Sequence, residues 1–139
     1  MRVRSALKLD GIVAPFTWTH ALHSLEKGVI VIFVGGTGNP YFTTDTTAAM
    51  RASEIEAEVL LKGTKVDGIY DKDPMKHKDA VKKDRLTYTD VLTQELNVMD
   101  QAAIALCREN KIPIHVFDLF SKGAMLKAVC EKKGGTLVT

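Results

Sequence analysis

Short apolar runs rich in β-branched residues alternate along this chain with segments in which apolar residues recur every three or four positions. The apolar runs predict strands at residues 2–7, 29–34, 58–61, 112–117 and 136–138. The run at 29–34 (VIVIFV) is apolar at every position, which is typical of a strand buried on both faces of a parallel sheet.

The segments between these strands have the three- and four-residue spacing of amphipathic helices. They predict helices from Thr17 or Thr19 to Leu25, and at residues 45–57, 91–96, 99–110 and 123–132. Asp67-Gly68 predicts a turn or hairpin, and the polar stretch 71–84 predicts a long loop. The alternation predicts an α/β fold, a mostly parallel sheet sandwiched between helices, as a single domain over residues 1–139.

Composition narrows the class of protein without changing this fold. With 139 residues, 45% of them hydrophobic, the chain is long enough to bury a core of its own. A net charge of +2 argues against nucleic-acid binding through bulk charge. The longest apolar run has six residues, whereas a membrane span needs roughly 20. Without a signal-peptide pattern, the expectation is a cytoplasmic protein with neither nucleic acid nor membrane as partner.

The two cysteines and the closest histidine pair predict no metal site. Cys107 and Cys130 lie among apolar neighbours in helical segments, where one disulfide is conceivable but buried free thiols in a reducing compartment are favoured. His20 and His23 share a helix face but have no third ligand nearby, so they are interpreted as packing or surface residues.

A glycine-rich loop at residues 35–44 (GGTGNPYFTT) leaves the most apolar strand and enters a helix. Ligands of α/β proteins bind at the carboxyl ends of strands, and helix N-termini attract phosphate. Thr37, Thr43, Thr44 and Asn39 add polar groups, although neither GxxxxGK[ST] nor a full GxGxxG is present. The loop is therefore either a phosphate site or a tight turn whose threonines cap the helix.

Acidic residues follow in three places, each with a structural and a functional interpretation. Asp45 either favours the helix dipole or orients a lysine or a metal beside a phosphate. Residues 64–74 hold three carboxylates within seven residues, an arrangement that is typical of turns but is also compatible with binding Mg²⁺. Tyr70, in the same segment, either stacks on a nucleotide base or belongs to the core. Asp100 either caps the helix at 99–110 or faces a site.

Three segments together resemble the bacterial uridylate kinases, a branch of the amino-acid kinase family: residues 36–49, 54–74 and 86–118. The stretch TKVDGIYDKDP is shared with aspartate and glutamate kinases and marks the wider family. The loop GTGNPYFTTD is typical of the uridylate kinases, with Tyr41 where phenylalanine is common. The resemblance extends over essentially the whole chain and implies a three-layer α/β/α fold.

The resemblance also implies an activity, a UMP kinase that transfers the γ-phosphoryl group of ATP to UMP, with Mg²⁺, in pyrimidine nucleotide biosynthesis. Asp45 and Asp100 correspond to an acidic pair near the transferred phosphate, and no residue is assigned as a metal ligand. The ATP site would include Thr64, Tyr70 and Asp73. The UMP site would include Thr37, Gly38, Asn39, Pro40, Tyr41, Phe42, Thr43 and Thr44. Arg2 and Trp18 match positions linked to a GTP effector, and the family assembles as homohexamers.

Members of this family are longer, and the chain corresponds only to their C-terminal, ATP-side half. The lysine-glycine phosphate loop of the N-terminal half has no counterpart here. We therefore expect a fragment of a longer enzyme, or one piece of a split enzyme, that binds ATP weakly and transfers phosphate poorly alone. The alternatives are an aspartate or acetylglutamate kinase-like member and a non-catalytic nucleotide-binding module.

Overall fold

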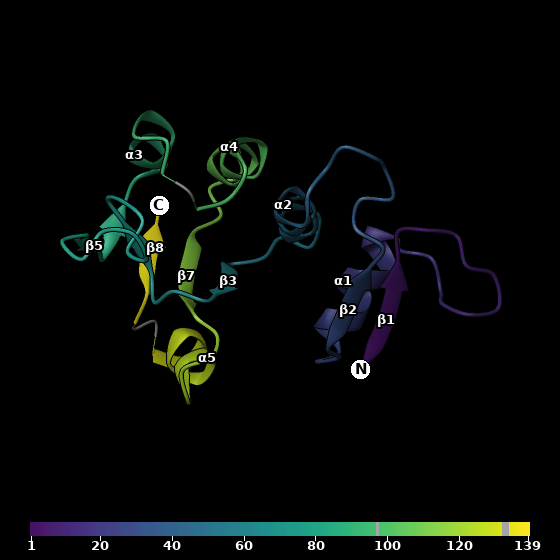
Figure 1. The fold of residues 1–139 in the computed structure, drawn as a ribbon. Coiled ribbons are helices and arrows are strands. Elements are labelled where there is room, and N and C mark those ends of the chain that lie inside the picture. The colour runs from purple at the N-terminus through teal and green to yellow at the C-terminus, as the bar shows by residue number, and fades with distance from the viewer. Residues whose placement is uncertain (97, 132–133) are drawn as a thin grey trace.

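The computed structural model describes residues 1–96, 98–131 and 134–139, and it contains both strands and helices, which alternate as far as β3 and again after α4 (Figure 1). The strands are β1 (Arg2–Ser5), β2 (Val31–Val34), β3 (Leu60–Thr64), β4 (Ile69–Tyr70), β5 (Lys82–Lys83), β6 (Arg85–Leu86), β7 (Ile114–Asp118) and β8 (Thr136–Val138). The helices are α1 (Trp18–Glu26), α2 (Thr44–Glu54), α3 (Tyr88–Thr93), α4 (Gln101–Glu109), α5 (Ala124–Leu126) and the π-helix η1 (Lys127–Glu131). Within the described ranges, no helix has the length and apolarity needed to cross a bilayer.

The strands form one pair, one larger sheet and one short ribbon. β1 pairs with β2 in parallel, from Arg2 opposite Val31 to Ser5 opposite Val34. The larger sheet has the order β3-β7-β8-β6, parallel between β3 and β7 and between β6 and β8, but antiparallel between β7 and β8. The predicted α/β class is confirmed, and the sheet is mixed because β8 returns against β7.

Asp67-Gly68 forms a bend between β3 and β4, as the turn alternative predicts, and does not close a hairpin, because β4 begins after it and pairs with β5, a strand inside the predicted loop. Gly68 has a φ of +153°, and a Cβ there would lie 2.6 Å from Thr136 Oγ1 and 2.8 Å from Lys82 Cε. Glycine is therefore required by the close approach of β8 and β5, and a local turn signal does not reveal such long-range crowding.

The prediction that the strand after α1 is buried on both faces is also wrong for the described structure. Phe33 packs edge-to-face on Phe16 at 5.4 Å, but Ile32 and Val34, on the other face of β2, are 39% and 37% exposed. Arg51 of α2 lies 3.9 Å from the centre of the Phe16 ring. The β1–β2 pair is thus attached to α2 through one face, while apolar side chains of the other face remain open to solvent.

The C-terminal helical segment differs from its prediction as well. In place of a regular helix over 123–132, α5 is one turn long and continues as the π-helix η1, and residue 132 lies outside the described residues. Both cysteines are free, Cys107 buried as predicted but Cys130 exposed. Cys130 differs because its segment lies on the outside of the molecule, with Ala128 its one buried residue.

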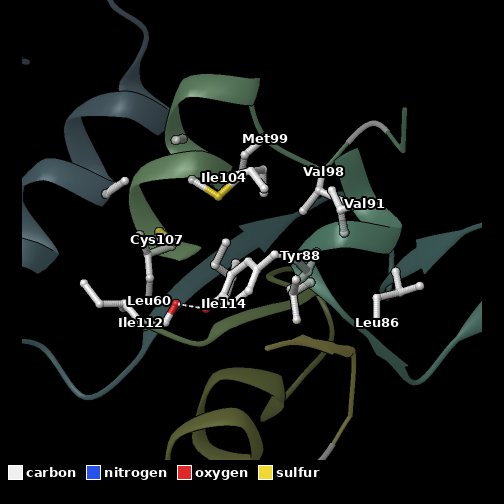
Figure 2. Close-up of a cluster of buried hydrophobic side chains, with 14 of the residues drawn as sticks. Leu60, Leu86, Tyr88, Val91, Val98, Met99, Ile104, Cys107, Ile112 and Ile114 are labelled. Carbon is white, nitrogen blue, oxygen red and sulfur yellow. Dashed lines mark hydrogen bonds between the residues drawn. The ribbon is translucent and has the colours of Figure 1, made fainter. Parts of the chain in front are cut away.

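The main core lies between the larger sheet and the helices α2, α3 and α4 (Figure 2). Ile104 of α4 and Ile114 of β7 are almost completely buried, and Tyr88 donates a hydrogen bond to the Ile112 carbonyl at 2.5 Å. Ala49 of α2 and Ala103 of α4 are also fully buried, and such small residues allow two helices to pack closely. This packing brings the N-terminal ends of α2 and α4 together.

Candidate functional site

The site begins at the N-terminus of α2, where Thr43 is the N-cap. Its hydroxyl oxygen accepts hydrogen bonds from the backbone N–H groups of Asp45, at 3.1 Å, and Thr46, at 3.2 Å. The capping interpretation of the threonines is therefore confirmed for Thr43. The cap also fixes the first turn of the helix, so that Asp45 and Thr46 are held at its end.

Asp100 joins this helix end to α4. It is the N-cap of α4, since Oδ1 accepts the N–H of Ala103 at 2.8 Å, and its Oδ2 accepts hydrogen bonds from the hydroxyls of Thr46, at 2.8 Å, and Thr43. Burial would raise the pKa of Asp100, but the hydrogen bonds from Thr43, Ala103 and Thr46 outweigh it and hold that pKa below its ordinary value. An ionised carboxylate thus connects two helix N-termini from distant parts of the sequence.

Asp45 makes a different contact, with a lysine that the sequence prediction missed. Nζ of Lys62 lies 2.7 Å from both carboxylate oxygens of Asp45, and the two side chains are 23% and 28% exposed. Lys62 stands in the middle of β3, directly after the apolar run VLL, and a cation that continues an apolar strand is the signal that identifies it. The functional interpretation of Asp45, that it orients a lysine, is therefore supported by geometry.

These groups face one cleft of about 430 Å³ beside the carboxyl end of β3. Asp45, Lys62, Thr64 and Asp100 line it, with Gly68 on its far wall. The N-termini of α2 and α4 add partial positive charge near the lysine, and the two carboxylates add negative charge. A phosphate group approaching this cleft would meet Lys62, which is paired with Asp45, and the Asp100 carboxylate.

A second cleft of about 430 Å³ adjoins the first and shares Val66, Gly68 and Ile69 with it. It contains Tyr70 and Asp73, whereas Thr64 lies in the first cleft and bonds locally to the backbone of Val66. The structure therefore brings the three predicted ATP-site residues onto two adjoining clefts.

Tyr70 is held at the wall of the second cleft by a polar contact. Its hydroxyl donates a hydrogen bond to Asp67 at 2.6 Å, and Lys82 Nζ donates to the other oxygen of that carboxylate at 2.9 Å. These hydrogen bonds, from Tyr70 first and Lys82 second, lower the pKa of Asp67, and the same contact raises the pKa of Tyr70. Tyr70 is absent from the buried core, so its ring is available at the cleft.

The predicted UMP loop is divided by the structure. Thr43 joins the acidic site, whereas Thr37 accepts the N–H of Asn39 at 3.0 Å within the loop itself. Tyr41, with a φ of 69°, is fully exposed, and Phe42 is 56% exposed. None of the eight predicted UMP residues lines either cleft, including the remaining three, Gly38, Pro40 and Thr44.

Comparison with known proteins identifies the family. The model of the amino acid kinase family matches residues 1–118. The chain belongs to the amino acid kinase family. Among solved structures, it is similar to UMP kinase from Ureaplasma parvum, with 42% identity, a TM-score of 0.92 and coverage of 99% of this chain and 59% of that one.

Two further kinases of known structure match this chain. UMP kinase from Bacillus anthracis has 36% identity and a TM-score of 0.94, with 99% of this chain and 57% of that one covered. Uridylate kinase from Archaeoglobus fulgidus has 33% identity and a TM-score of 0.71, covering 97% and 61%. The chain thus spans about three fifths of the length of the kinases it matches.

A bound Mg²⁺ would need oxygen ligands, and the carboxylates of Asp71 and Asp73, within residues 64–74, are already engaged. Asp71 accepts the N–H of Val81 at 2.8 Å, and Asp73 accepts that of Met75 at 2.9 Å. Within the part of the chain that the structure describes, no three His, Cys, Asp or Glu side chains form a metal-binding group. The turn interpretation of this segment is therefore favoured. On the first cleft, Asp45 is paired with Lys62 and Asp100 accepts hydrogen bonds from Thr46 and Ala103, so either carboxylate would have to exchange a partner to support an ion that takes its other ligands from phosphate and water.

Proposed function

We propose that this chain forms the acidic, ATP-side part of a UMP kinase, an enzyme that transfers the γ-phosphoryl group of ATP to UMP and yields UDP and ADP. The observation that carries the proposal is the Lys62–Asp45 ion pair, at 2.7 Å, on the same cleft as the Asp100 carboxylate that joins α2 to α4. The similarity to UMP kinases from two bacteria and to an archaeal uridylate kinase supports UMP as the acceptor.

The proposed chemistry depends on positioning and charge. In the transfer, the bond from the γ-phosphorus to the bridging oxygen of ATP breaks, and a bond to a phosphate oxygen of UMP forms. That oxygen is already ionised near neutral pH, so no strong general base is required. Lys62, released from Asp45 toward a phosphate oxygen, would offset the repulsion between the two anions, and Asp45 keeps the lysine oriented before the substrates bind.

The two adjoining clefts suggest how the substrates are arranged. ATP would extend along the cleft of Tyr70 and Asp73, with its γ-phosphate near the shared wall at Gly68 and Ile69. UMP would approach from the side of the glycine-rich loop, so that its phosphate meets the N-terminus of α2. The transferred group would then lie between Lys62 and Asp100, where the cationic and acidic groups of the first cleft converge.

The donor set fits Mg²⁺ in the way such ions bind with nucleotides. Mg²⁺ usually keeps several waters and takes one or two carboxylates together with phosphate oxygens. Asp45 and Asp100 are the carboxylates in place for that role. When bound, the ion would neutralise charge on the phosphates, while Lys62 and the two helix N-termini hold the phosphate oxygens.

The finer assignments belong to the same proposal. They are ATP as donor, a place in pyrimidine nucleotide biosynthesis, assembly as a homohexamer and a cytoplasmic location. A GTP effector near Arg2 and Trp18 is part of the proposal too. All of them derive from the resemblance to the uridylate kinases, and sedimentation of the whole protein with and without GTP measures the assembly and the effector together.

The binding half of the proposal is tested by calorimetric titration of the chain with Mg·ATP. We expect Lys62→Met to weaken the binding of ATP at least tenfold, or by about 1.4 kcal/mol, because a side chain that contacts phosphate is lost. Lys8→Met is the matched control, since Lys8 also pairs with an aspartate, Asp10, but at an exposed position outside both clefts. Equal affinity of Lys62→Met and the unmodified chain would contradict the proposal.

A substrate panel tests the acceptor. Transfer from ATP to UMP, with no transfer to aspartate or acetylglutamate, is expected. Phosphorylation of either carboxylate in place of UMP would instead assign the chain to another branch of the amino acid kinase family. ATP binding without transfer to any of the three acceptors by the complete protein would favour a nucleotide-binding module.

A further inference from the structure

Two charged residues near the second cleft, Asp67 and Lys82, have no part in the chemistry proposed above. Asp67 lies in the bend before β4, and Lys82 is the first residue of β5. Neither residue lines the first or the second cleft. Both are nevertheless connected, through the carboxylate of Asp67, to Tyr70, which does line the second cleft. An effect of these two residues on a ligand in that cleft would therefore be transmitted by Tyr70.

The β4–β5 ribbon places Tyr70 and Lys82 on one face. The two residues are directly opposite each other in this antiparallel pair, and the side chains of directly opposed residues lie on the same face. Oδ1 of Asp67 accepts a hydrogen bond from the Tyr70 hydroxyl at 2.6 Å, and Oδ2 accepts one from Lys82 Nζ at 2.9 Å. One carboxylate thus joins the polar ends of a cross-strand pair.

Lys82 reaches this carboxylate by passing close to the backbone of the bend. A Cβ on Gly68 would lie 2.8 Å from Lys82 Cε, so a larger residue there would displace the stem of the lysine. The side chain of Lys82 is 28% exposed, which shields its ion pair with Asp67 in part from solvent. The position of the cation is therefore set by the bend as well as by its partner.

The ribbon is itself attached to the larger sheet. The N–H of Ile69 donates a hydrogen bond to Thr136 Oγ1 at 2.8 Å, and Thr136, in β8, is fully buried. On the other side of Tyr70, the N–H of Asp71 donates to the Val81 carbonyl at 3.1 Å. The backbone of Tyr70 is therefore held on both sides, which leaves the orientation of its ring to be fixed by side-chain contacts.

The ionisation of these groups favours the contact. The pKa of Asp67 is lowered by the hydrogen bond from Tyr70 first and by Lys82 second, so the carboxylate is charged near neutral pH. The same hydrogen bond raises the pKa of Tyr70, so its hydroxyl keeps the proton that it donates. The three side chains consequently form a charge-assisted network, which is stronger than one between neutral groups.

We propose that Asp67 and Lys82 are positioning residues for ATP, which hold the ring of Tyr70 at the wall of the second cleft so that the purine base stacks on it. This role rests on the proposed function, which places ATP in that cleft. Immobilising a side chain during binding costs affinity, and a ring that is already held avoids that cost. The two charged residues thus contribute to the affinity for ATP without touching the nucleotide.

Calorimetric titration of the chain with Mg·ATP tests this role. Asp67→Ala and Tyr70→Phe, which keeps the ring but removes the hydroxyl, should each weaken ATP binding about fivefold, because the ring must then be immobilised on binding. If Asp67 acts through the hydroxyl, the double variant should bind ATP as tightly as Tyr70→Phe alone. Additive losses in the double variant would overturn the proposal.

Lysine variants separate the ion pair from a general effect on the ribbon. Lys82→Met should weaken ATP binding about threefold, since the ion pair is partly exposed, and Lys82→Arg should retain the affinity. Lys83→Met is the matched control, because Lys83 is the next residue of β5, on its other face, and lines neither cleft. Equal losses for Lys82→Met and Lys83→Met would overturn the proposal.

The ultraviolet absorbance of tyrosinate measures the contact of Tyr70 directly. The difference between the unmodified chain and Tyr70→Phe isolates the titration of Tyr70, whose midpoint should lie above the ordinary pKa of 10.0. Asp67→Ala should lower this midpoint toward 10.0, and an unchanged midpoint would overturn the proposal. The titration uses no nucleotide and the calorimetry no UMP, so a failure of phosphoryl transfer would count against the proposed function and not against this role.

Discussion

Asp100 provides the most quantitative test of the site, because one carboxylate caps α4 and also holds two threonines of the α2 terminus. Asp100→Ala removes an N-cap, which costs about 1 kcal/mol. It also removes the hydrogen bonds from Thr43 and Thr46, which together add about 1 kcal/mol after allowance for their partial exposure. The free energy of unfolding should therefore fall by about 2 kcal/mol, and by about 1 kcal/mol for Asp100→Asn, which keeps the cap.

Urea denaturation of the chain at neutral pH measures this loss. With a slope of about 2 kcal/mol per molar urea, Asp100→Ala should lower the midpoint by roughly 1 M. Combining it with Thr46→Val should give a smaller loss than the sum of the single variants, because both remove the same hydrogen bond. Asp90→Ala is the matched control: Asp90 closes the capping box of α3 and has no contact with Thr46, so its effect should add to that of Thr46→Val.

The pH dependence has a defined sign. The pKa of Asp100 in the folded protein lies below its ordinary value of 3.8, so its stabilisation is complete above about pH 4 and is lost as the pH falls through the folded value. The difference between the unmodified chain and Asp100→Asn should shrink below pH 4. A loss under about 0.5 kcal/mol for Asp100→Ala, or strict additivity with Thr46→Val, would refute the described contact between α2 and α4.

Two further predictions concern positions outside the clefts. Gly135→Ala should destabilise the protein by about 3 kcal/mol in thermal melts, because a Cβ there would lie 2.0 Å from a carbonyl oxygen of β7 and φ is +77°. Gly134→Ala, with φ of +76° and open space, should cost only about 1 kcal/mol, and equal losses would contradict this assignment. A thiol reagent should modify Cys130 quickly and Cys107 only after denaturation, since Cys107 is buried and burial raises its pKa to about 11. Two fast thiols in the native protein would contradict the description of the core.

Periodicity and capping signals predict much of this fold because they act over a few residues. β8 has the predicted bounds, 136–138, and Asp100 caps the predicted helix. The pairing of β4 with β5 was missed because it depends on contacts across a long polar loop, and Gly68 is required by crowding from β8 that no local pattern reveals. Contacts between residues far apart in the sequence therefore determine the strand pairing that local turn signals do not predict.

The candidate site could be predicted only in part for the same reason. The sequence indicates Asp45 and Asp100 as residues at helix starts, but their convergence on one cleft follows from the packing of α2 on α4. Lys62 was missed because the predicted strand, residues 58–61, ends one residue before it, whereas β3 continues to Thr64. β2, by contrast, has the sequence of a strand buried on both faces but has β1 as its one strand partner in the described residues, which the apolar pattern does not predict.

The central claim is that Lys62, Asp45 and Asp100 serve phosphoryl transfer from ATP to UMP. The most direct measurement is ³¹P NMR of ATP, UMP and Mg²⁺ with a fusion of this chain to the residues of the Ureaplasma parvum UMP kinase that it does not match. We expect ADP and UDP to form in equal amounts. Their formation should be lost in the Lys62→Met variant and retained in the Lys8→Met variant. UDP formation that survives Lys62→Met, or transfer to aspartate or acetylglutamate in place of UMP, would contradict it.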